Sequence, residues 1–351
     1  MTTLPPHRAV HVRAPGKINL ALRAGAPRPD GYHPLATVFQ AVSLYEDVVA
    51  RPAEDITLEI HGRGADLPTD GTNLAVRAAT LLRETSGTAA GVHLSLTKQV
   101  PVAGGMAGGS ADAAATLLAC DQLWGTGLDR EELAELAAEL GADVPFALTG
   151  MSAMGTGRGD VLAPVMSRGQ YHWVLAVQEW GLSTPEVFRT LDALRGHDAW
   201  AGAPASAPRG IRPRSGAGAA GVTGGAATGA ATGAASAAPA LPAVDSGDEL
   251  VGALLSADPL VLARHLHNDL EEAALELRPE LGDVLAAADR AGALAALVSG
   301  SGPTVAALAL DAVHATSVAG VMRAADVAAE ILTVTGPVPG ARVIEHVQGR
   351  R

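Results

Sequence analysis

One stretch of the chain decides its fold, residues 98–115, which read KQVPVAGGMAGGSADAAA. Four glycines fall within residues 104–109, and the stretch continues into an apolar helix pattern that carries Leu117 and Leu118. Glycine lets the backbone come close to a ligand and adopt positive φ angles. The free amides at the start of a helix point outward, and the helix dipole attracts an anion there. The pattern therefore predicts a loop and helix start that hold phosphate, with a ligand-free strand-to-helix turn as the alternative.

Two other glycine motifs do not fit this stretch. A Walker A loop has Lys after its last glycine, whereas Ser110 follows Gly109. A dinucleotide fingerprint needs a second glycine two residues after the first, and counting from Gly104 that position is Met106. A nicotinamide-dependent oxidoreductase is therefore disfavoured. Ser110 is expected either to cap the helix or to turn its hydroxyl toward a phosphate-bound Mg²⁺.

Composition narrows the class of protein. The chain of 351 residues is long enough for about two domains, and its apolar share of 48% fits a globular protein. The net charge of −12 argues against nucleic acid or an anionic membrane as the main partner. The single cysteine, Cys120, lies in a helix pattern and is expected to be a buried apolar side chain. Residues 1–10 contain no apolar run typical of a secretory signal, so we expect a cytoplasmic protein.

Strands are predicted where apolar and polar residues alternate, as in residues 56–60 and 92–96. Residues 295–310 are predicted to form two strands around a Gly-rich turn.

Helices are predicted where apolar residues share one helical face, as in residues 74–82. Asp129 and Glu132 form a capping-box pattern, and Gly141 suits the end of that helix.

Strands and helices are mixed throughout, which predicts an α+β protein. We expect a first domain at 1–165 and a second at 166–351, with the boundary near residues 164–170. Residues 201–244 are almost entirely Ala, Gly, Pro, Ser and Thr, which predicts a disordered insertion within the second domain.

Residues 101–115 resemble the phosphate loop of the GHMP small-molecule kinases. Their ending is similar to the branch that phosphorylates 4-diphosphocytidyl-2-C-methyl-D-erythritol. Five more blocks agree with that branch: residues 14–20, 30–35 followed by 39–40, 141–146, 268–271 and 299–305. The resemblance implies a two-domain GHMP kinase fold, with an N-terminal ATP-binding α/β domain and a C-terminal ferredoxin-like α+β domain.

The resemblance also implies which residues bind ATP and Mg²⁺. The loop residues assigned to ATP are Pro101, Val102, Ala103, Gly104, Gly105, Met106, Ala107, Gly108, Gly109, Ser110 and Ala111. Asn73 and Lys98 match positions on the adenine side, and Ser110 is the candidate for Mg²⁺. This chain has Ala107 where the family has glycine and Ala111 where it has a second serine. A Cβ at position 107 is unfavourable if φ is positive, so we expect these changes to tune ATP affinity.

Phosphoryl transfer needs a group that accepts the proton of the attacking hydroxyl and a cation near the phosphate. Asp143 follows a predicted helix end, where an unpaired carboxylate is poorly placed, so a cationic partner is expected. Only two lysines occur in the chain, and Lys17 lies in an apolar strand pattern. The resemblance pairs Asp143 with Lys17 as the catalytic couple. Asn19 lies on the same strand face as Lys17 and is expected to contact the substrate or the carboxylate.

The substrate loop carries Tyr32 and His33 in a chain whose aromatic share is only 3%. An exposed aromatic ring suits stacking on a nucleobase. In the resembled branch, Tyr32 and Phe188 enclose the cytosine and His33 contacts its polar edge, while Thr184 belongs to the same substrate-binding segment. Core packing is the alternative role for Phe188.

The leading hypothesis is an ATP-dependent kinase of the non-mevalonate isoprenoid route that phosphorylates the 2-hydroxyl of the diphosphocytidyl-methylerythritol substrate. It would act on a small molecule as a monomer or homodimer. One alternative is a GHMP kinase for homoserine or mevalonate, which would have no use for a base-stacking tyrosine. A second alternative is a non-catalytic nucleotide-binding regulator, which would not need both Lys17 and Asp143.

Overall fold

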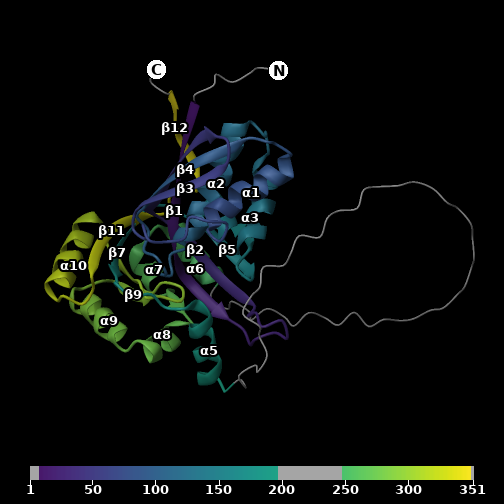
Figure 1. Cartoon of the computed structure of the whole chain (residues 1–351). Coiled ribbons are helices and arrows are strands. Elements are labelled where there is room, and N and C mark those ends of the chain that lie inside the picture. Colours follow the sequence, from purple (N-terminus) through teal and green to yellow (C-terminus); the bar gives the residue numbers. More distant parts are fainter. Residues whose placement is uncertain (1–7, 197–246, 349–351) are drawn as a thin grey trace, which may run out of the picture.

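The computed structural model describes residues 8–196 and 247–348 (Figure 1). The predicted insertion at 201–244 lies outside the described residues. Within the described part, no helix has the length and apolarity required to span a membrane.

The first sheet is built on two long antiparallel strands, β1 (Arg8–Ala24) and β2 (Leu35–Ala53). Its main path runs in the order β12-β1-β2-β4-β3. The other strands of this sheet are β3 (Ile56–Gly62), β4 (Gly91–Lys98), β5 (Ser152–Gly157), β6 (Val161–Pro164), β8 (His267–Asn268) and β12 (Arg342–Gln348). The two alternating patterns that predicted strands are confirmed as β3 and β4.

Four helices accompany this sheet: α1 (Leu74–Ser86), α2 (Gly108–Trp124), α3 (Arg130–Leu140) and α4 (Val144–Thr149). The Ala-rich helix α2 packs against β1, β2 and α1, which buries most of its residues, including Cys120. Small alanine side chains allow this close approach on several sides at once. The capping box is confirmed, because Asp129 accepts from the backbone of Glu132 and the Glu132 side chain accepts from the backbone of Asp129.

The second sheet is antiparallel and has the order β11-β7-β10-β9. Its strands are β7 (Tyr171–Val177), β9 (Ala295–Val298), β10 (Val305–Ala309) and β11 (Glu330–Gly336). In chain order this arrangement is 4-1-3-2, the ferredoxin-like topology. The two strands predicted around a Gly-rich turn are confirmed as β9 and β10.

Helices cover both faces of the second sheet. One face packs on α5 (Thr184–Leu194), α8 (Glu271–Leu277), α9 (Glu280–Arg290) and α10 (Ala312–Ala324). The other face packs on α6 (Gly247–Ser256) and α7 (Pro259–Ala263) and on residues of the first sheet. In Figure 1, α8, α9 and α10 lie on the far side of the second sheet from α1 and α2.

The two sheets share a core. Ile18 and Leu20 of β1 and Met106 of the glycine loop belong to the same buried cluster as Trp173 and Leu175 of β7. The glycine loop is therefore held between the two sheets.

The chain passes from the first sheet to the second between β6 and β7, which is where the domain boundary was predicted. After β11 it returns, and β12 pairs with β1 in the first sheet. The division of the chain into two domains at residue 165 remains a prediction. The return of β12 to the first sheet was not indicated by the sequence.

Candidate active site

The glycine loop adopts three left-handed backbone conformations before α2 begins. Gly105 has φ +73°, and the non-glycine residues Ala103 and Ala107 have φ +51° and +58°. Ala107 is the N-cap of α2, so the family's usual glycine is replaced at a position that does require a positive φ. A Cβ in this region costs about 1–2 kcal/mol. The glycine loop therefore carries backbone strain where it enters α2, and its binding of phosphate remains a prediction.

The loop docks on the turn between β9 and β10. A Cβ added to Gly105 would lie 2.1 Å from the carbonyl oxygen of Ser299, so only glycine permits this contact. The Ser299 hydroxyl in turn donates to the carbonyl of Gly105 at 3.3 Å. Two glycine-rich segments from different sheets thus meet at the start of α2.

Lys17 points into this junction from β1. Its Nζ donates to Asn19 Oδ1 at 2.8 Å and to the carbonyl of Gly105 at 3.1 Å, and the residue is only 7% exposed. A Cβ on Gly300 would lie 3.3 Å from the same Nζ, so the turn between β9 and β10 closes over the ammonium. Burial lowers the pKa of Lys17, and the charge of Asp143 opposes that change.

Asp143 lies between α3 and α4, and the sequence patterns did not predict the short helix that follows it. Its side chain does not cap α4. Among the described residues, no ion pair within 4.0 Å joins Asp143 to Lys17, although their charges interact. Lys17 and Asp143 therefore interact through their charges without forming an ion pair, and their catalytic role remains a prediction.

The substrate loop meets α5. The rings of His33 and Phe188 stack with centroids 4.6 Å apart and planes inclined by 28°. His33 Nε2 also lies 2.9 Å from Asp192 Oδ1 on the same helix. Tyr32 is 49% exposed, and the guanidinium carbon of Arg158 lies 5.1 Å from its ring centroid. Phe188 thus contacts His33, and Tyr32 contacts Arg158. The sequence analysis did not find Arg158, because it lies far from Tyr32 in the sequence.

Thr184 lies at the start of α5 and faces the same turn that covers Lys17. Its hydroxyl is hydrogen-bonded to the hydroxyl of Ser301 at 2.9 Å. The helix that carries Phe188 is therefore connected to the junction between the two glycine-rich segments.

Lys98, predicted on the adenine side of the ATP site, is buried between two carboxylates, and a nucleotide contact for it remains a prediction. It is 4% exposed, and its Nζ lies 3.0 Å from Glu46 Oε1 and 2.5 Å from Asp112 Oδ2. Burial and the charge of Asp112 raise the pKa of Glu46 to about 8, although Lys98 opposes the shift. Burial would lower the pKa of Lys98, but Asp112 and Glu46 together raise it. Lys98 precedes the phosphate loop and bonds to Asp112, which follows it, so the ammonium connects the two ends of the loop. The sequence analysis named neither Asp112 nor Glu46 as a partner of Lys98.

Asn73, the other residue predicted on the adenine side, caps α1. Its side chain accepts from the backbone of Ala75 at 2.9 Å and donates to the carbonyl of Pro68 at 2.8 Å. A direct nucleotide contact for Asn73 remains a prediction.

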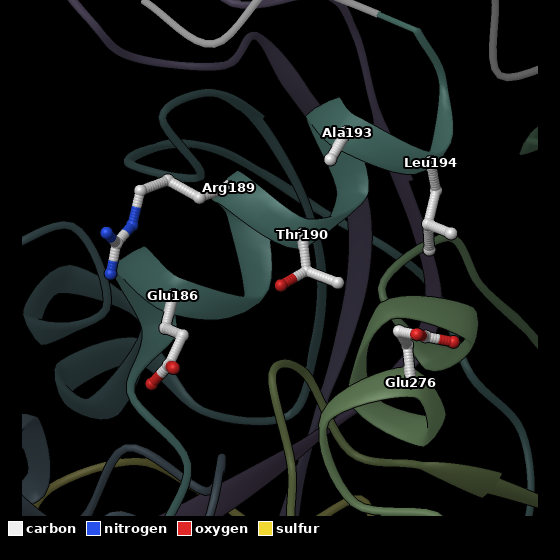
Figure 2. A pocket seen from close by; sticks show the side chains of 6 residues that line it. All are labelled: Glu186, Arg189, Thr190, Ala193, Leu194 and Glu276. Carbon is white, nitrogen blue, oxygen red and sulfur yellow. The ribbon is translucent and has the colours of Figure 1, made fainter. Parts of the chain in front are cut away.

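Two open pockets lie near these segments. The larger, about 470 Å³, lies between α5 and α8 (Figure 2). It is lined by Glu186, Arg189, Thr190, Ala193, Leu194 and Glu276. The view shows Glu186 and Thr190 on one helix and Glu276 on the other, and the phosphate loop does not contribute. The smaller, about 360 Å³, is lined by residues that include Lys98 and Gln99, so it borders the start of the phosphate loop.

Comparison with known proteins agrees with this geometry. Residues 73–151 match the GHMP kinases N terminal domain, and residues 250–328 match the GHMP kinases C terminal domain. The phosphate loop between two sheets and the buried Lys17 beside it define a small-molecule kinase, and the chain belongs to the GHMP kinase family. Members of this family use ATP as the phosphate donor.

Relatives that match nearly the whole chain have a more particular name. A protein of Leifsonia xyli is 50% identical, covers 96% of this chain and 99% of its own length, and is named 4-diphosphocytidyl-2-C-methyl-D-erythritol kinase. A protein of Streptomyces coelicolor with the same name is 47% identical over 96% of this chain and 100% of its own.

Solved structures agree with the fold. A crystal structure of 4-(cytidine 5'-diphospho)-2C-methyl-D-erythritol kinase superposes with a TM-score of 0.65 at 30% identity, covering 93% of this chain and 98% of its own. A homoserine kinase from Cytophaga hutchinsonii gives the same TM-score at 22% identity, over 98% of this chain and 99% of its own, which shows the shared fold alone.

Proposed function

We propose that this kinase transfers the γ-phosphoryl group of ATP to the 2-hydroxyl of 4-diphosphocytidyl-2-C-methyl-D-erythritol, a step of the non-mevalonate route to isoprenoid precursors. The observation that carries the proposal is the position of Lys17. Its buried ammonium contacts the phosphate loop at Gly105, interacts with the charge of Asp143, and is covered by a turn connected to the substrate helix α5. The names of the relatives support this substrate.

In this proposal Asp143 accepts the proton of the attacking hydroxyl. Its carboxylate has no capping hydrogen bond, so it is available to a substrate. Lys17 offsets negative charge on the transferred phosphoryl group and on Asp143.

The phosphate loop at residues 101–111 is proposed to hold the ATP phosphates through its backbone amides and the start of α2. Ser110 lies in the first turn of α2 and is proposed to contact the Mg²⁺ that accompanies ATP. Among the described residues no group of three His, Cys, Asp or Glu side chains is arranged to hold a metal ion. One protein oxygen together with ATP phosphates suits Mg²⁺, which keeps several waters and binds few protein groups.

The cytidine end is proposed to bind at Tyr32, His33 and Phe188, with Thr184 at the start of the same helix. The exposed ring of Tyr32 offers a face for a base. The stack of His33 on Phe188 already brings the substrate loop against α5. Arg158, beside Tyr32, adds a positive charge suited to the diphosphate of the substrate.

We also propose a monomer or homodimer that acts in the cytoplasm. ATP, the donor, is a cytoplasmic metabolite.

The test is ADP release by the purified protein with ATP and Mg²⁺ and one of three acceptors: the diphosphocytidyl-methylerythritol compound, homoserine or mevalonate. We expect turnover only with the first, and a loss of about 10²–10⁴-fold in kcat for Asp143→Asn with unchanged ATP binding. Turnover with another alcohol alone would contradict the substrate. An Asp143→Asn variant that keeps full activity would contradict the base.

A further inference from the structure

A buried threonine outside the predicted site is hydrogen-bonded to Asn19. Thr37 lies on β2, is 1% exposed and pairs with Leu22 near the C-terminal end of β1. Its hydroxyl donates to the carbonyl of Ala21 at 2.7 Å, and Asn19 Nδ2 donates to that hydroxyl at 2.8 Å. Asn19 Oδ1 accepts from Lys17 Nζ at 2.8 Å. Three side chains thus form a continuous hydrogen-bonded chain from the catalytic ammonium to the backbone of β1.

In this series of hydrogen bonds, the groups at the two ends determine which atom donates and which accepts in every bond. The ammonium of Lys17 can only donate, and the carbonyl of Ala21 can only accept. The single hydrogen of the Thr37 hydroxyl is used on Ala21, so its lone pair must accept from the NH₂ of Asn19. A reversed Asn19 amide would direct its NH₂ at the ammonium. Thr37 therefore selects the amide orientation that Lys17 needs.

We infer that Thr37 is a positioning residue for phosphoryl transfer, which acts through Asn19 to hold the Lys17 ammonium at the phosphate loop. The inference rests on the proposed function of Lys17. Without the hydroxyl, Asn19 loses the acceptor for its NH₂ in a buried site. The amide is then held from one side only and can turn away from Lys17, which removes one of the two hydrogen bonds of Lys17 while the bond to Gly105 remains.

Among the described residues, no carboxylate forms an ion pair with Lys17 within 4.0 Å that could replace the hydrogen bond to Asn19. Gly105 and Gly300 approach the ammonium with backbone only, and the ring of Phe39 on β2 has its centroid 5.4 Å away. Asp143 is the charged group whose field reaches Lys17. A weaker hold on the ammonium is therefore expected to affect the chemical step more than the binding of either substrate.

The decisive variants are Thr37→Val, which removes the hydroxyl and keeps the shape, and Thr37→Ser, which keeps the hydroxyl. Thr116→Val is the matched control. Thr116 is fully buried in α2, and its Oγ1 has no hydrogen-bond partner among the described residues. The change of Thr116 to valine therefore removes a hydroxyl that forms no hydrogen bond among the described residues.

Steady-state kinetics separate positioning from a structural role. We expect Thr37→Val to lower kcat by about 10- to 100-fold while both KM values change less than about threefold. Thr37→Ser is expected to keep at least about half of the wild-type kcat, and Thr116→Val to match the wild type. A Thr37→Val kcat within twofold of the wild type would overturn the inference. So would an equal loss in Thr37→Ser, since the methyl group would then be the cause.

A second readout does not depend on turnover. Because Lys17 and Lys98 are the only lysines, protein labelled with ¹³C-lysine gives two side-chain signals, and Lys98 serves as the internal reference. We expect Thr37→Val to lower the pKa of Lys17 below its wild-type value, because the charged form loses a hydrogen bond, and to leave Lys98 unchanged. An unchanged Lys17 titration would contradict the inference.

The two readouts distinguish this inference from the proposed function. A wild-type protein that is inactive on all three acceptors would contradict the proposed function, and the Lys17 titration would still decide whether Thr37 controls the ammonium.

Discussion

Replacing Lys98 by Met is expected to lower the free energy of unfolding by about 3–5 kcal/mol at pH 8. Lys98 Nζ lies 3.0 Å from Glu46 Oε1 and 2.5 Å from Asp112 Oδ2, and all three side chains are buried. Methionine has a similar length and no charge. The variant therefore leaves two buried carboxylates facing each other without a cation, which is the costly way to break a buried ion pair.

The loss is expected to shrink as the pH falls. Burial and Asp112 raise the pKa of Glu46 from 4.5 to about 8 even with Lys98 present. Without the ammonium, which lowers that pKa, the value rises further. Above pH 4.5 the folded protein then holds protons that the unfolded chain has released, so stability falls as the pH rises toward the folded pKa. At pH 5 Glu46 is protonated in the folded variant at little cost, and most of the loss disappears.

Urea denaturation followed by circular dichroism at pH 5 and pH 8 measures this effect. The set comprises the wild type, Lys98→Met, Asp112→Asn and the double variant. Since the side chains of Lys98 and Asp112 are in contact, their double-mutant cycle is expected to give a coupling energy of about 1–3 kcal/mol. A loss below about 1 kcal/mol at pH 8, or an equal loss at both pH values, would refute the reasoning. A raised KM for ATP with unchanged stability would instead support the sequence-based prediction that Lys98 contacts the nucleotide.

Three further substitutions test the loops and the substrate site. Gly105→Ala places a Cβ against the carbonyl of Ser299 at a positive φ, so urea denaturation should show a loss of at least about 2 kcal/mol, and wild-type stability would contradict the docking of the loop. Ala107→Gly relieves a left-handed alanine and should stabilise the protein by about 0.5–1 kcal/mol in thermal melts, whereas a lower melting temperature would argue against that strain. Phe188→Ala removes the ring that stacks on His33 and should raise the KM of the cytidine-bearing acceptor about 5- to 100-fold with unchanged KM for ATP; an unchanged acceptor KM would count against the proposed cytidine site.

Short-range patterns made much of this protein predictable. The glycine stretch before α2 indicated a phosphate loop, because a helix start and its preceding glycines are contiguous in sequence. The capping box at Asp129 and the strand alternation in β3 and β4 depend on neighbours within a few residues, and all three are confirmed. The GHMP kinase fold is confirmed as well, because both domains of that family match the chain. It could be predicted because its motifs are short and are spread along the sequence.

Long-range partners were not predictable. Glu46 and Asp112 reach Lys98 across 52 and 14 residues, and Arg158 reaches Tyr32 from another hairpin. No local pattern encodes such pairs, because they form only when the sheets have closed. The unexpected helix α4 after Asp143 is too short, at six residues, to leave a clear helical period.

The sequence by itself thus determined the class of fold, and its motifs predicted the phosphate loop and, through the family resemblance, the two residues proposed for catalysis. Only the tertiary structure decided how they are held. It placed Gly105 between Lys17 and the turn at Ser299, and it separated Asp143 from a direct ion pair with Lys17. It also connected Lys17 through Asn19 to Thr37. The physical reason is that burial and hydrogen-bond direction depend on which segments surround a side chain, and that is fixed only when distant strands pack together.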